Sequence, residues 1–151
     1  MKAISIIQPW ATLIVHGHKR IETRSWKTNH LGPLLIHASK TIPNASKDLC
    51  DEEPFKSYLA KTPTPTWSSL PRGCLLGIVE LTAVLPCELL SDHEDLTPVE
   101  KTFGDFTSGR WCWILKNPSP LVVPFPLRGA VGLFEILDSI WHLALQGQNQ
   151  P

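Results

Sequence analysis

A short polar stretch, residues 20–26, has the residue types of a ligand-binding strand. Side chains alternate between the two faces of an extended strand. One face would then carry Arg20, Glu22, Arg24 and Trp26. The guanidinium of Arg24 matches the geometry of a phosphate or a base edge, and the indole of Trp26 could stack on a base. The alternative is an exposed strand face on which these charges pair with one another.

Two more charged residues, Lys19 and Glu80, are candidates for a catalytic or binding role. Lys19 lies in the turn before residues 20–26, where a lysine could bind phosphate or act as a base, or simply be solvated. Glu80 is the one ionisable residue in the apolar stretch 74–85. Because an unpaired buried carboxylate is costly, we expect Glu80 to pair with Lys19 or Arg24 at a cleft floor. It could serve as a general base or accept from an amino group, or form a purely structural ion pair.

Tryptophans supply further candidates for stacking. Trp111 and Trp113 alternate with Arg110 along an expected strand, so both indoles point the same way. Paired aromatic residues on a strand are more often core than ligand-binding, and we expect this above all for Trp113. Trp10, at the start of an expected helix, is a candidate for the cleft floor.

Two other positions combine groups that could contact a ligand. His37 and Ser39 are two residues apart and share a strand face, which would place a hydroxyl near an imidazole. Arg128 precedes a glycine that permits close approach to a phosphate, with a simple tight turn as the alternative. The ligand-binding candidates are therefore Trp10, Arg24, Trp26, His37, Ser39, Arg110, Trp111 and Arg128.

The charge distribution predicts a local basic face on a neutral protein. Fourteen basic and fourteen acidic residues cancel, which excludes a protein that coats DNA through a general positive charge. Residues 1–47 nevertheless hold seven bases and one acid, whereas residues 48–108 hold four bases and eleven acids. We therefore expect the N-terminal segment to form one positive cleft wall.

Cysteines and histidines give no metal-site pattern. The four cysteines, at 50, 74, 87 and 112, form no CxxC pair, and the six histidines do not cluster with ligand spacing. We expect no metal, no cofactor and reduced thiols, with Cys74 and Cys112 as small core residues. No apolar run approaches the length of a membrane span. These features favour a cytoplasmic protein.

The apolar pattern predicts many short strands and few helices. Expected strands cover residues 2–7, 20–26, 34–37, 74–85, 110–116, 121–125 and 130–136, and expected helices cover 9–17, 44–61 with a break at Pro54, and a short segment after a capping box at 97–100. With helices confined to the first two-thirds, this predicts an α+β fold, a mixed β-barrel of five to seven strands with short flanking helices. We expect one domain over 1–146 and a flexible tail at 147–151.

Several sequence blocks together resemble the ASCH domain family. The stretch 17–24 fits the signature G-x-K-x-x-E-x-R, and it follows Gln8-Pro9-Trp10-Ala11. Further blocks in the same order are Ile36-His37-Ala38-Ser39, Gly77-Ile78-Val79-Glu80-Leu81, Gly109-Arg110-Trp111-Cys112-Trp113 and the stretch 128–133. The resemblance covers residues 2–137.

The resemblance implies a PUA-like barrel with a cleft for RNA or a modified nucleoside. It also implies two alternatives: a small hydrolase, either an N4-acetylcytidine amidohydrolase or a ribonuclease, and an interaction module of the transcription-coactivator type. In the amidohydrolase branch a threonine follows the lysine by three positions, where this chain has Glu22. Turnover would then rest on Lys19, Glu22 and Glu80, and we expect binding with slow or no amide hydrolysis.

Overall fold

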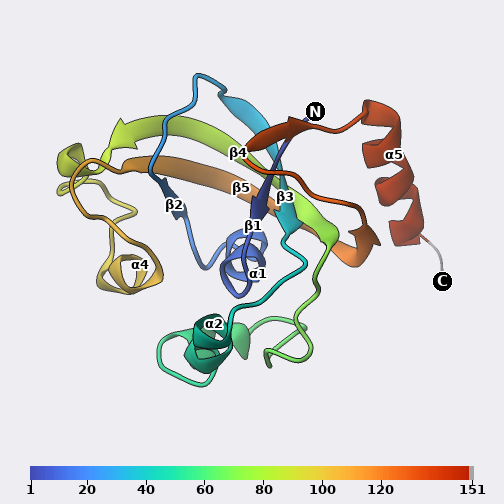
Figure 1. The fold of residues 1–151 in the computed structure, drawn as a ribbon, viewed down its shortest axis with the longest axis horizontal. Coiled ribbons are helices and arrows are strands. Elements are labelled where there is room, and N and C mark those ends of the chain that lie inside the picture. The colour runs from blue at the N-terminus through green and yellow to red at the C-terminus, as the bar shows by residue number, and fades with distance from the viewer. Residues whose placement is uncertain (150–151) are drawn as a thin grey trace.

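Within residues 1–149, which this computed structural model describes, six strands form one curled sheet in the order β2–β5–β4–β3–β1–β6, with five short α-helices around it (Figure 1). The strands are β1 (Lys2–Ile6), β2 (Ile21–Arg24), β3 (Gly32–Ala38), β4 (Cys74–Pro86), β5 (Trp111–Pro126) and β6 (Leu133–Glu135). The helices are α1 (Trp10–Val15), α2 (Asn44–Leu49), α3 (Phe55–Leu59), α4 (Pro98–Phe103) and α5 (Asp138–Gln146). β1 and β3 pair in parallel, and the other neighbouring strands are antiparallel.

This architecture confirms the predicted α+β class and the predicted number of strands. The sheet is a curled half-barrel, because the edge strands β2 and β6 each pair on one side only. The expectation that helices are confined to the first two-thirds of the chain is wrong, since α5 lies at the C-terminal side. Its signal was weak because its N-cap position is Leu137, which supplies no capping hydrogen bond.

The two longest strands, β4 and β5, produce the curl. They pair along most of their lengths with three register shifts, which bend the ladder. We predicted two strands at 110–116 and 121–125, but β5 runs through the prolines between them. β5 pairs with β2 only over 111–114, so the proline-rich remainder pairs on one side, where missing N–H groups are tolerated. Gly77 in β4 leaves room for the backbone of Ser119, which a Cβ would strike.

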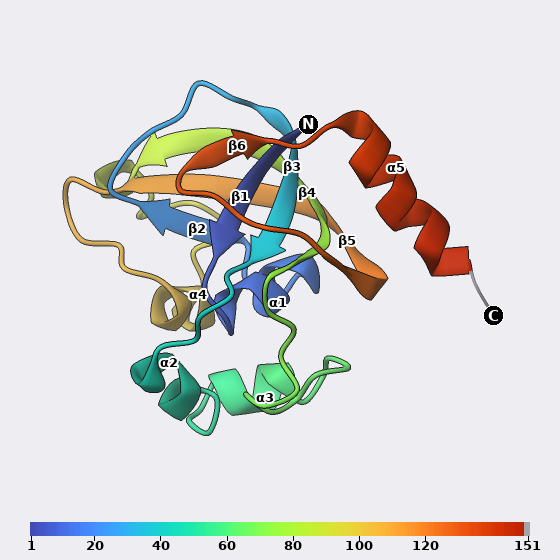
Figure 2. The same cartoon turned by 45° about the vertical axis from the view of Figure 1, so that its right-hand side comes forward.

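The sheet buries apolar side chains on both faces. On β3, Leu34 and Ile36 belong to the cluster that α1 covers, whereas Leu35 between them belongs to the cluster with Trp141 of α5. Figure 2 shows α5 on one side of the sheet and the other helices on the opposite side. Trp113 is fully buried in the α1 cluster, as predicted for a core residue.

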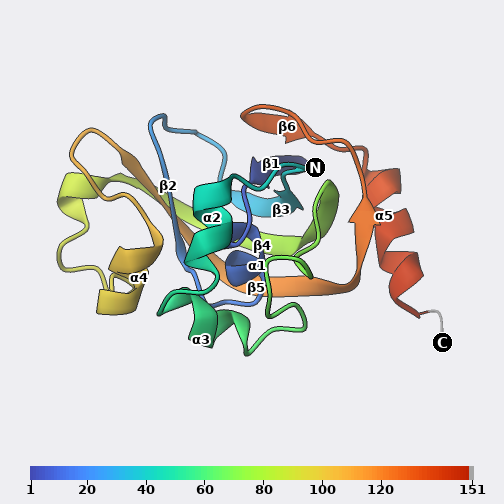
Figure 3. The same ribbon diagram turned by 60° about the horizontal axis from the view of Figure 1, so that its bottom comes forward.

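The helices α1 to α4 gather on the side of the sheet that comes forward in Figure 3, apart from α5 at the right. Leu13, Phe55 and Phe103 join α1, α3 and α4 in a separate apolar cluster. The predicted helix at 44–61 is present as α2 and α3, and its break falls at Pro54 as expected. The predicted cap of α4 is also present, because the Thr97 hydroxyl accepts from the backbone N–H of Glu100 at 3.1 Å.

The cysteines depart from the expectation of reduced thiols. Cys87 and Cys112 form a disulfide, with their Cα atoms 5.4 Å apart. The two cysteines are 25 residues apart, a spacing that does not predict a disulfide. They come together because β5 pairs with the end of β4. Cys74 is free and buried, in agreement with its predicted place in the core.

The ends of the expected domain can be compared with the structure only in part. Gly147–Asn149 form a 3-10 turn, η2. The Gln148 side chain accepts from the backbone N–H of Val123 at 2.8 Å and donates to the Val123 carbonyl at 3.1 Å. The last two residues of the expected tail lie outside the described residues. Among the helices of the described chain, none is long and apolar enough to cross a membrane.

Candidate functional site

A cavity of about 1460 Å³ opens where the C-terminal ends of β1 and β3 meet β2, the end of α4 and the segment 127–132. Figure 2 shows the arrowheads of β1 and β3 side by side, with β2 next to them. Most of the predicted site residues line this cavity: Trp10, Glu22, Arg24, Trp26, His37, Ser39, Arg110 and Arg128. Lys19, Glu80 and Trp111 do not line it.

The polar face of β2 supplies the charged centre of the cavity. As predicted, Glu22 and Arg24 alternate with buried residues and share one face. Arg24 Nη2 lies 4.0 Å from Glu22 Oε2 and donates to the Ser5 carbonyl at 3.1 Å. Arg110 donates to the Thr23 carbonyl at 3.2 Å, so its guanidinium is held against the same strand. The Arg24 guanidinium is therefore paired with Glu22, whereas that of Arg110 lies 3.5 Å from Asp105.

The cavity is positive although the whole chain is neutral. Its lining holds five basic side chains and two acidic ones, Glu22 and Asp105, which leaves +3. Lys40, Arg72 and Arg128 are exposed there, and none of these three has an ion-pair partner within residues 1–149. Unpaired cations in a concavity attract anions.

Two indoles on the cavity wall are held in place by aromatic neighbours. Trp26 packs edge-on against the buried Trp113, with ring centroids 4.9 Å apart, and Trp10 packs against Phe55 at 5.9 Å. Both tryptophans are half-buried, so each keeps part of its surface open to the cavity. Trp111 lies outside, and its ring stacks under Lys27, whose Nζ is 5.3 Å from the centroid.

Lys19 is buried below the cavity instead of lying at its edge. Its side chain is 1% exposed, and Nζ donates to the carbonyl of Ile21 and lies 3.9 Å from Glu100 Oε1. A Cβ on Gly104, which lines the cavity, would be 3.5 Å from this Nζ. The buried ammonium group therefore lies close to the cavity lining at Gly104, and it pairs with Glu100, not with Glu80.

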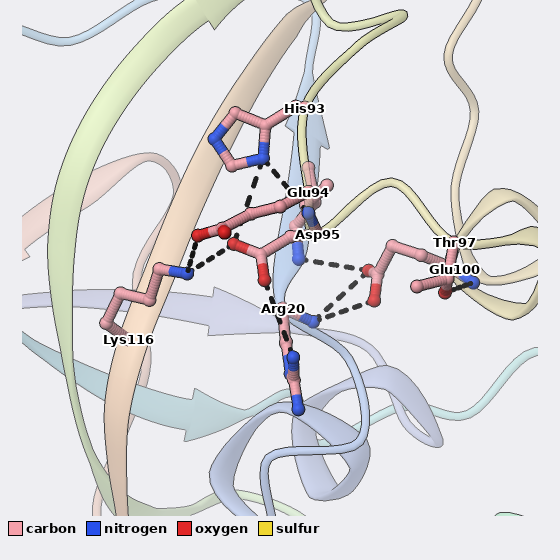
Figure 4. A network of polar contacts seen from close by, with 8 residues as sticks. Arg20, His93, Glu94, Asp95, Thr97, Glu100 and Lys116 are labelled. Atoms are coloured by element: carbon pink, nitrogen blue, oxygen red, sulfur yellow. Dashed lines mark hydrogen bonds and ion pairs between the residues drawn. The ribbon is translucent and has the colours of Figure 1, made fainter.

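Glu100 is a structural residue that the sequence reasoning did not single out. Its carboxylate accepts from the backbone N–H groups of Arg20 and Ile21 at 3.0 Å each (Figure 4). Burial raises the pKa of Glu100, although the charge of Lys19 and these hydrogen bonds oppose the rise. In the sequence, Glu100 is already explained as the last residue of the capping box at 97–100. No pattern in the sequence therefore indicates that its carboxylate also contacts the start of β2.

A second buried carboxylate, Asp95, fixes the segment before α4. It contacts Lys116 of β5 and lies 3.5 Å from Nη1 of Arg20, with His93 beside it (Figure 4). Burial opposes ionisation of Asp95, but the hydrogen bond and the charge of Lys116 outweigh it, so its pKa lies below the usual range. Together, Asp95 and Glu100 position the N-terminal end of β2 and hence the site residues that follow.

The expected placement of Glu80 at the cleft floor is wrong. Its side chain is exposed, and Oε2 accepts from the Asn117 amide at 2.9 Å. Val79 and Leu81 on either side point inward, so alternation turns Glu80 outward. The carboxylate thereby avoids the cost of burial by solvation, not by an ion pair with Lys19 or Arg24.

His37 contacts a serine other than the one expected. Nδ1 lies 3.0 Å from Ser5 Oγ and Nε2 lies 2.8 Å from the Leu127 carbonyl, whereas Ser39 lines the cavity without a hydrogen bond to the ring. Burial lowers the pKa of His37, and the bond to Leu127 opposes this. The parallel pairing of β1 and β3 brings Ser5 opposite His37, a contact that strand spacing alone does not reveal.

Comparison with known proteins gives one family match and related chains. The family described as ASCH domain matches residues 4–125. Activating signal cointegrator 1 of Homo sapiens and of Mus musculus are each 31% identical over 144 residues, which is 95% of this chain and 24% of theirs. The chain therefore spans about a quarter of the length of these relatives.

The fold also matches solved structures. The ASCH protein from Zymomonas mobilis is 16% identical with a TM-score of 0.57, covering 97% of this chain and 93% of that one. A serine-to-alanine variant of the same Zymomonas mobilis protein is 15% identical with a TM-score of 0.58, covering 96% and 94%. At this identity the likeness concerns the fold alone.

Proposed function

Because this chain belongs to the ASCH domain family, we propose that it binds RNA or a modified nucleoside in the cavity beside β2. The observation that carries the proposal is the meeting of Arg24, Arg110 and Trp26 on one wall of a positively charged concavity. Guanidinium groups bind phosphate oxygens in a forked geometry, and an indole stacks on any base.

The phosphate would lie among the basic side chains. Arg24 and Arg110 each use one or two donors on the protein backbone, and they pair with Glu22 and Asp105 respectively. Their remaining Nη donors are the groups that would contact a ligand. Arg72 and Arg128 also line the cavity and are exposed, so they add two further cations that a phosphate could contact. The net charge of +3 in the lining suits an anionic ligand.

The base would stack on Trp26, with Trp10 as a second surface. Glu22, 12% exposed, can accept from an exocyclic amino group, and Ser39 can donate or accept. These groups would supply selectivity among bases, whereas the arginines would supply affinity. The three expected catalytic residues, Lys19, Glu22 and Glu80, do not lie together, since only Glu22 lines the cavity. The proposal is therefore ligand binding, with no reaction that uses all three.

Binding of a fluorescein-labelled single-stranded RNA, followed by fluorescence anisotropy across a salt series, tests the proposal. We expect the affinity to fall with salt by a slope near ~0.7 per phosphate contact. Nucleoside monophosphates should compete with the RNA. An affinity that is independent of salt, or that is unchanged when Trp26 and Arg24 are both replaced, would contradict it.

A further inference from the structure

Ser5 and His37 form a hydrogen-bonded pair in the wall of the cavity. Parallel pairing of β1 with β3 sets the two residues at the same register, with Oγ 3.0 Å from Nδ1. On its other side the ring contacts the carbonyl of Leu127, at 2.8 Å from Nε2. Both ring nitrogens are therefore engaged, and the imidazole is fixed in one orientation.

The hydrogen positions follow from the chemistry of Leu127. A carbonyl oxygen only accepts, so Nε2 of His37 carries the proton and donates it. In a neutral imidazole the other nitrogen then has the free lone pair, and the Ser5 hydroxyl donates to it. Burial lowers the pKa of His37, so the ring is neutral near pH 7 and can accept a proton.

We propose that Ser5 is a nucleophile with His37 as its general base, and that the pair cleaves carboxylic esters carrying an anionic group. The arrangement is that of serine hydrolases, in which an oriented imidazole takes the hydroxyl proton. Here the carbonyl of Leu127 stands where such enzymes have a carboxylate. A dipole stabilises the imidazolium less than a full charge does, so esters, with better leaving groups than amides, are the matching substrates.

The preference for an anionic ester comes from two arginines near the pair. Arg24 Nη2 donates to the main-chain carbonyl of Ser5 at 3.1 Å, which places the guanidinium beside the nucleophilic residue. Arg128 is exposed in the segment that covers the pair. These cations would hold the anionic group and stabilise negative charge that develops on the carbonyl oxygen.

Gly129 shows how closely the backbone passes over the pair. A Cβ at this position would lie 2.5 Å from both Ser5 Oγ and His37 Cε1. A residue with a side chain could not take this place without moving the pair or the segment 127–132. Ser5 itself is half-buried and lines the cavity, which is the side from which the proposed ester would reach its hydroxyl.

The reaction would proceed in two balanced steps. As Ser5 Oγ forms a bond to the ester carbon, its proton moves to His37 Nδ1, and the carbonyl electron pair moves to oxygen. Collapse of this species breaks the bond to the alcohol oxygen, which takes the proton from Nδ1 and leaves acyl-Ser5. Water then attacks the acyl group in the same way, giving a carboxylic acid and the original hydroxyl.

Labelling of the full chain with a fluorophosphonate probe, followed by intact-mass and peptide mass spectrometry, tests the proposal. We expect one adduct per chain, on Ser5, formed with loss of fluoride. His37→Gln should slow labelling at least tenfold, because general-base assistance contributes about 10²–10⁴-fold. p-Nitrophenyl acetate should give a burst of nitrophenol that Ser5→Ala abolishes. The nitrophenyl monoester of succinic acid, which carries a carboxylate, should be cleaved faster than the acetate.

Ser57→Ala, an exposed serine outside the cavity, is the matched control and should label at the wild-type rate. Because the wild-type peptide map identifies the labelled serine, the result does not depend on whether Ser5→Ala folds. No adduct on Ser5, an adduct on Ser39 instead, or labelling that His37→Gln leaves unchanged would overturn the proposal. RNA binding is measured separately on the wild-type chain, so failure here would not count against the binding function.

Discussion

The guanidinium of Arg24 donates to the carbonyl of Ser5 at 3.1 Å and thereby joins β2 to β1, two strands that do not pair in the sheet. The sheet curls far enough for its edge strand β2 to reach the strand that carries Ser5. Arg24 therefore connects the two walls of the cavity while exposing 25% of its side chain to a ligand. The curl that the register shifts of β4 and β5 produce thus brings a site residue of β2 into contact with β1.

Replacing Arg24 should weaken RNA binding. Arg24→Gln removes a charge and a forked donor, and we expect a loss of about tenfold in affinity with a salt slope lower by ~0.7. The affinity of Arg24→Lys should lie between those of Arg24→Gln and the wild type, because lysine keeps the charge but lacks the forked donor geometry of a guanidinium. Anisotropy with single-stranded RNA measures both. Lys56→Gln, the same change of charge at an exposed position outside the cavity, should leave affinity unaltered.

Removal of the Trp26 indole should weaken binding without changing its salt dependence. Stacking on an aromatic residue contributes about 1–3 kcal/mol per base, so Trp26→Ala should cost roughly 5- to 150-fold in affinity. Trp26→Phe should recover part of the loss, because a smaller ring remains. Trp67→Ala is the control, since this tryptophan is exposed and lies outside the cavity. An equal loss for the Trp26 and Trp67 variants would argue against stacking at the site.

Much of the fold could be predicted because local signals agreed with it. Alternation placed Glu22 and Arg24 on one face of β2, and Pro54 marked the break between α2 and α3. The unbroken course of β5 could not be predicted, since its prolines are tolerated only where one side of the strand is unpaired. Whether one side of β5 is unpaired depends on where β2 ends, and the sequence around the prolines does not indicate that.

The site could be predicted as a set of residues but not as a set of contacts. Lys19 was identified, but its partner Glu100 lies 81 residues away and already had a role as part of a capping box. The sequence predicts Glu80 at the cleft floor because it is an isolated charge in an apolar stretch, but alternation along β4 turns it outward to solvent. Ser5 was missed because its contact with His37 depends on parallel strand pairing.

The buried pair of Lys19 and Glu100 should stabilise the fold, and removing one member should be costly. Glu100→Ala leaves a buried ammonium and two backbone N–H groups without their acceptor, so we expect a loss of about 3–5 kcal/mol in the free energy of unfolding. Replacing both residues, as in Lys19→Met with Glu100→Leu, should cost less than Glu100→Ala alone. Urea denaturation of the wild type, of Glu100→Ala and of the double variant measures the three free energies of unfolding. Glu80→Gln, at an exposed carboxylate, should change stability by under about 0.5 kcal/mol.

A side chain at Gly129 should disturb the site more than the core. Gly129→Ala places a methyl group against Ser5 and His37, so the segment 127–132 has to move away from the ring. We expect the hydrogen bond from His37 to Leu127 to be lost, at a cost of about 1–3 kcal/mol including the displaced backbone. Slower nitrophenyl acetate cleavage should accompany this loss. Gly147→Ala, where no atom lies within 4 Å of an added Cβ, is the matched control.

Stability should fall as the pH drops from about 7.5 to 5.5, because folding buries or partly buries three histidines. Burial lowers the pKa of His37, and burial also lowers the pKa values of His16 and His18. Over this range the unfolded chain binds more protons than the folded chain, so protonation favours unfolding. The raised pKa of Glu100 acts in the opposite direction, because the folded chain holds a proton on this carboxyl more readily than the unfolded chain does.

His37→Gln isolates the contribution of the ring in the cavity wall. The glutamine cannot be protonated, so the slope of unfolding free energy against pH should decrease, by at most about 1.4 kcal/mol per pH unit. Urea denaturation at several pH values measures the slope for the variant and for the wild type. His142→Gln, at an exposed position on α5, should keep the wild-type slope. Equal slopes for the wild type and both variants would show that His37 does not titrate differently in the folded and unfolded chains.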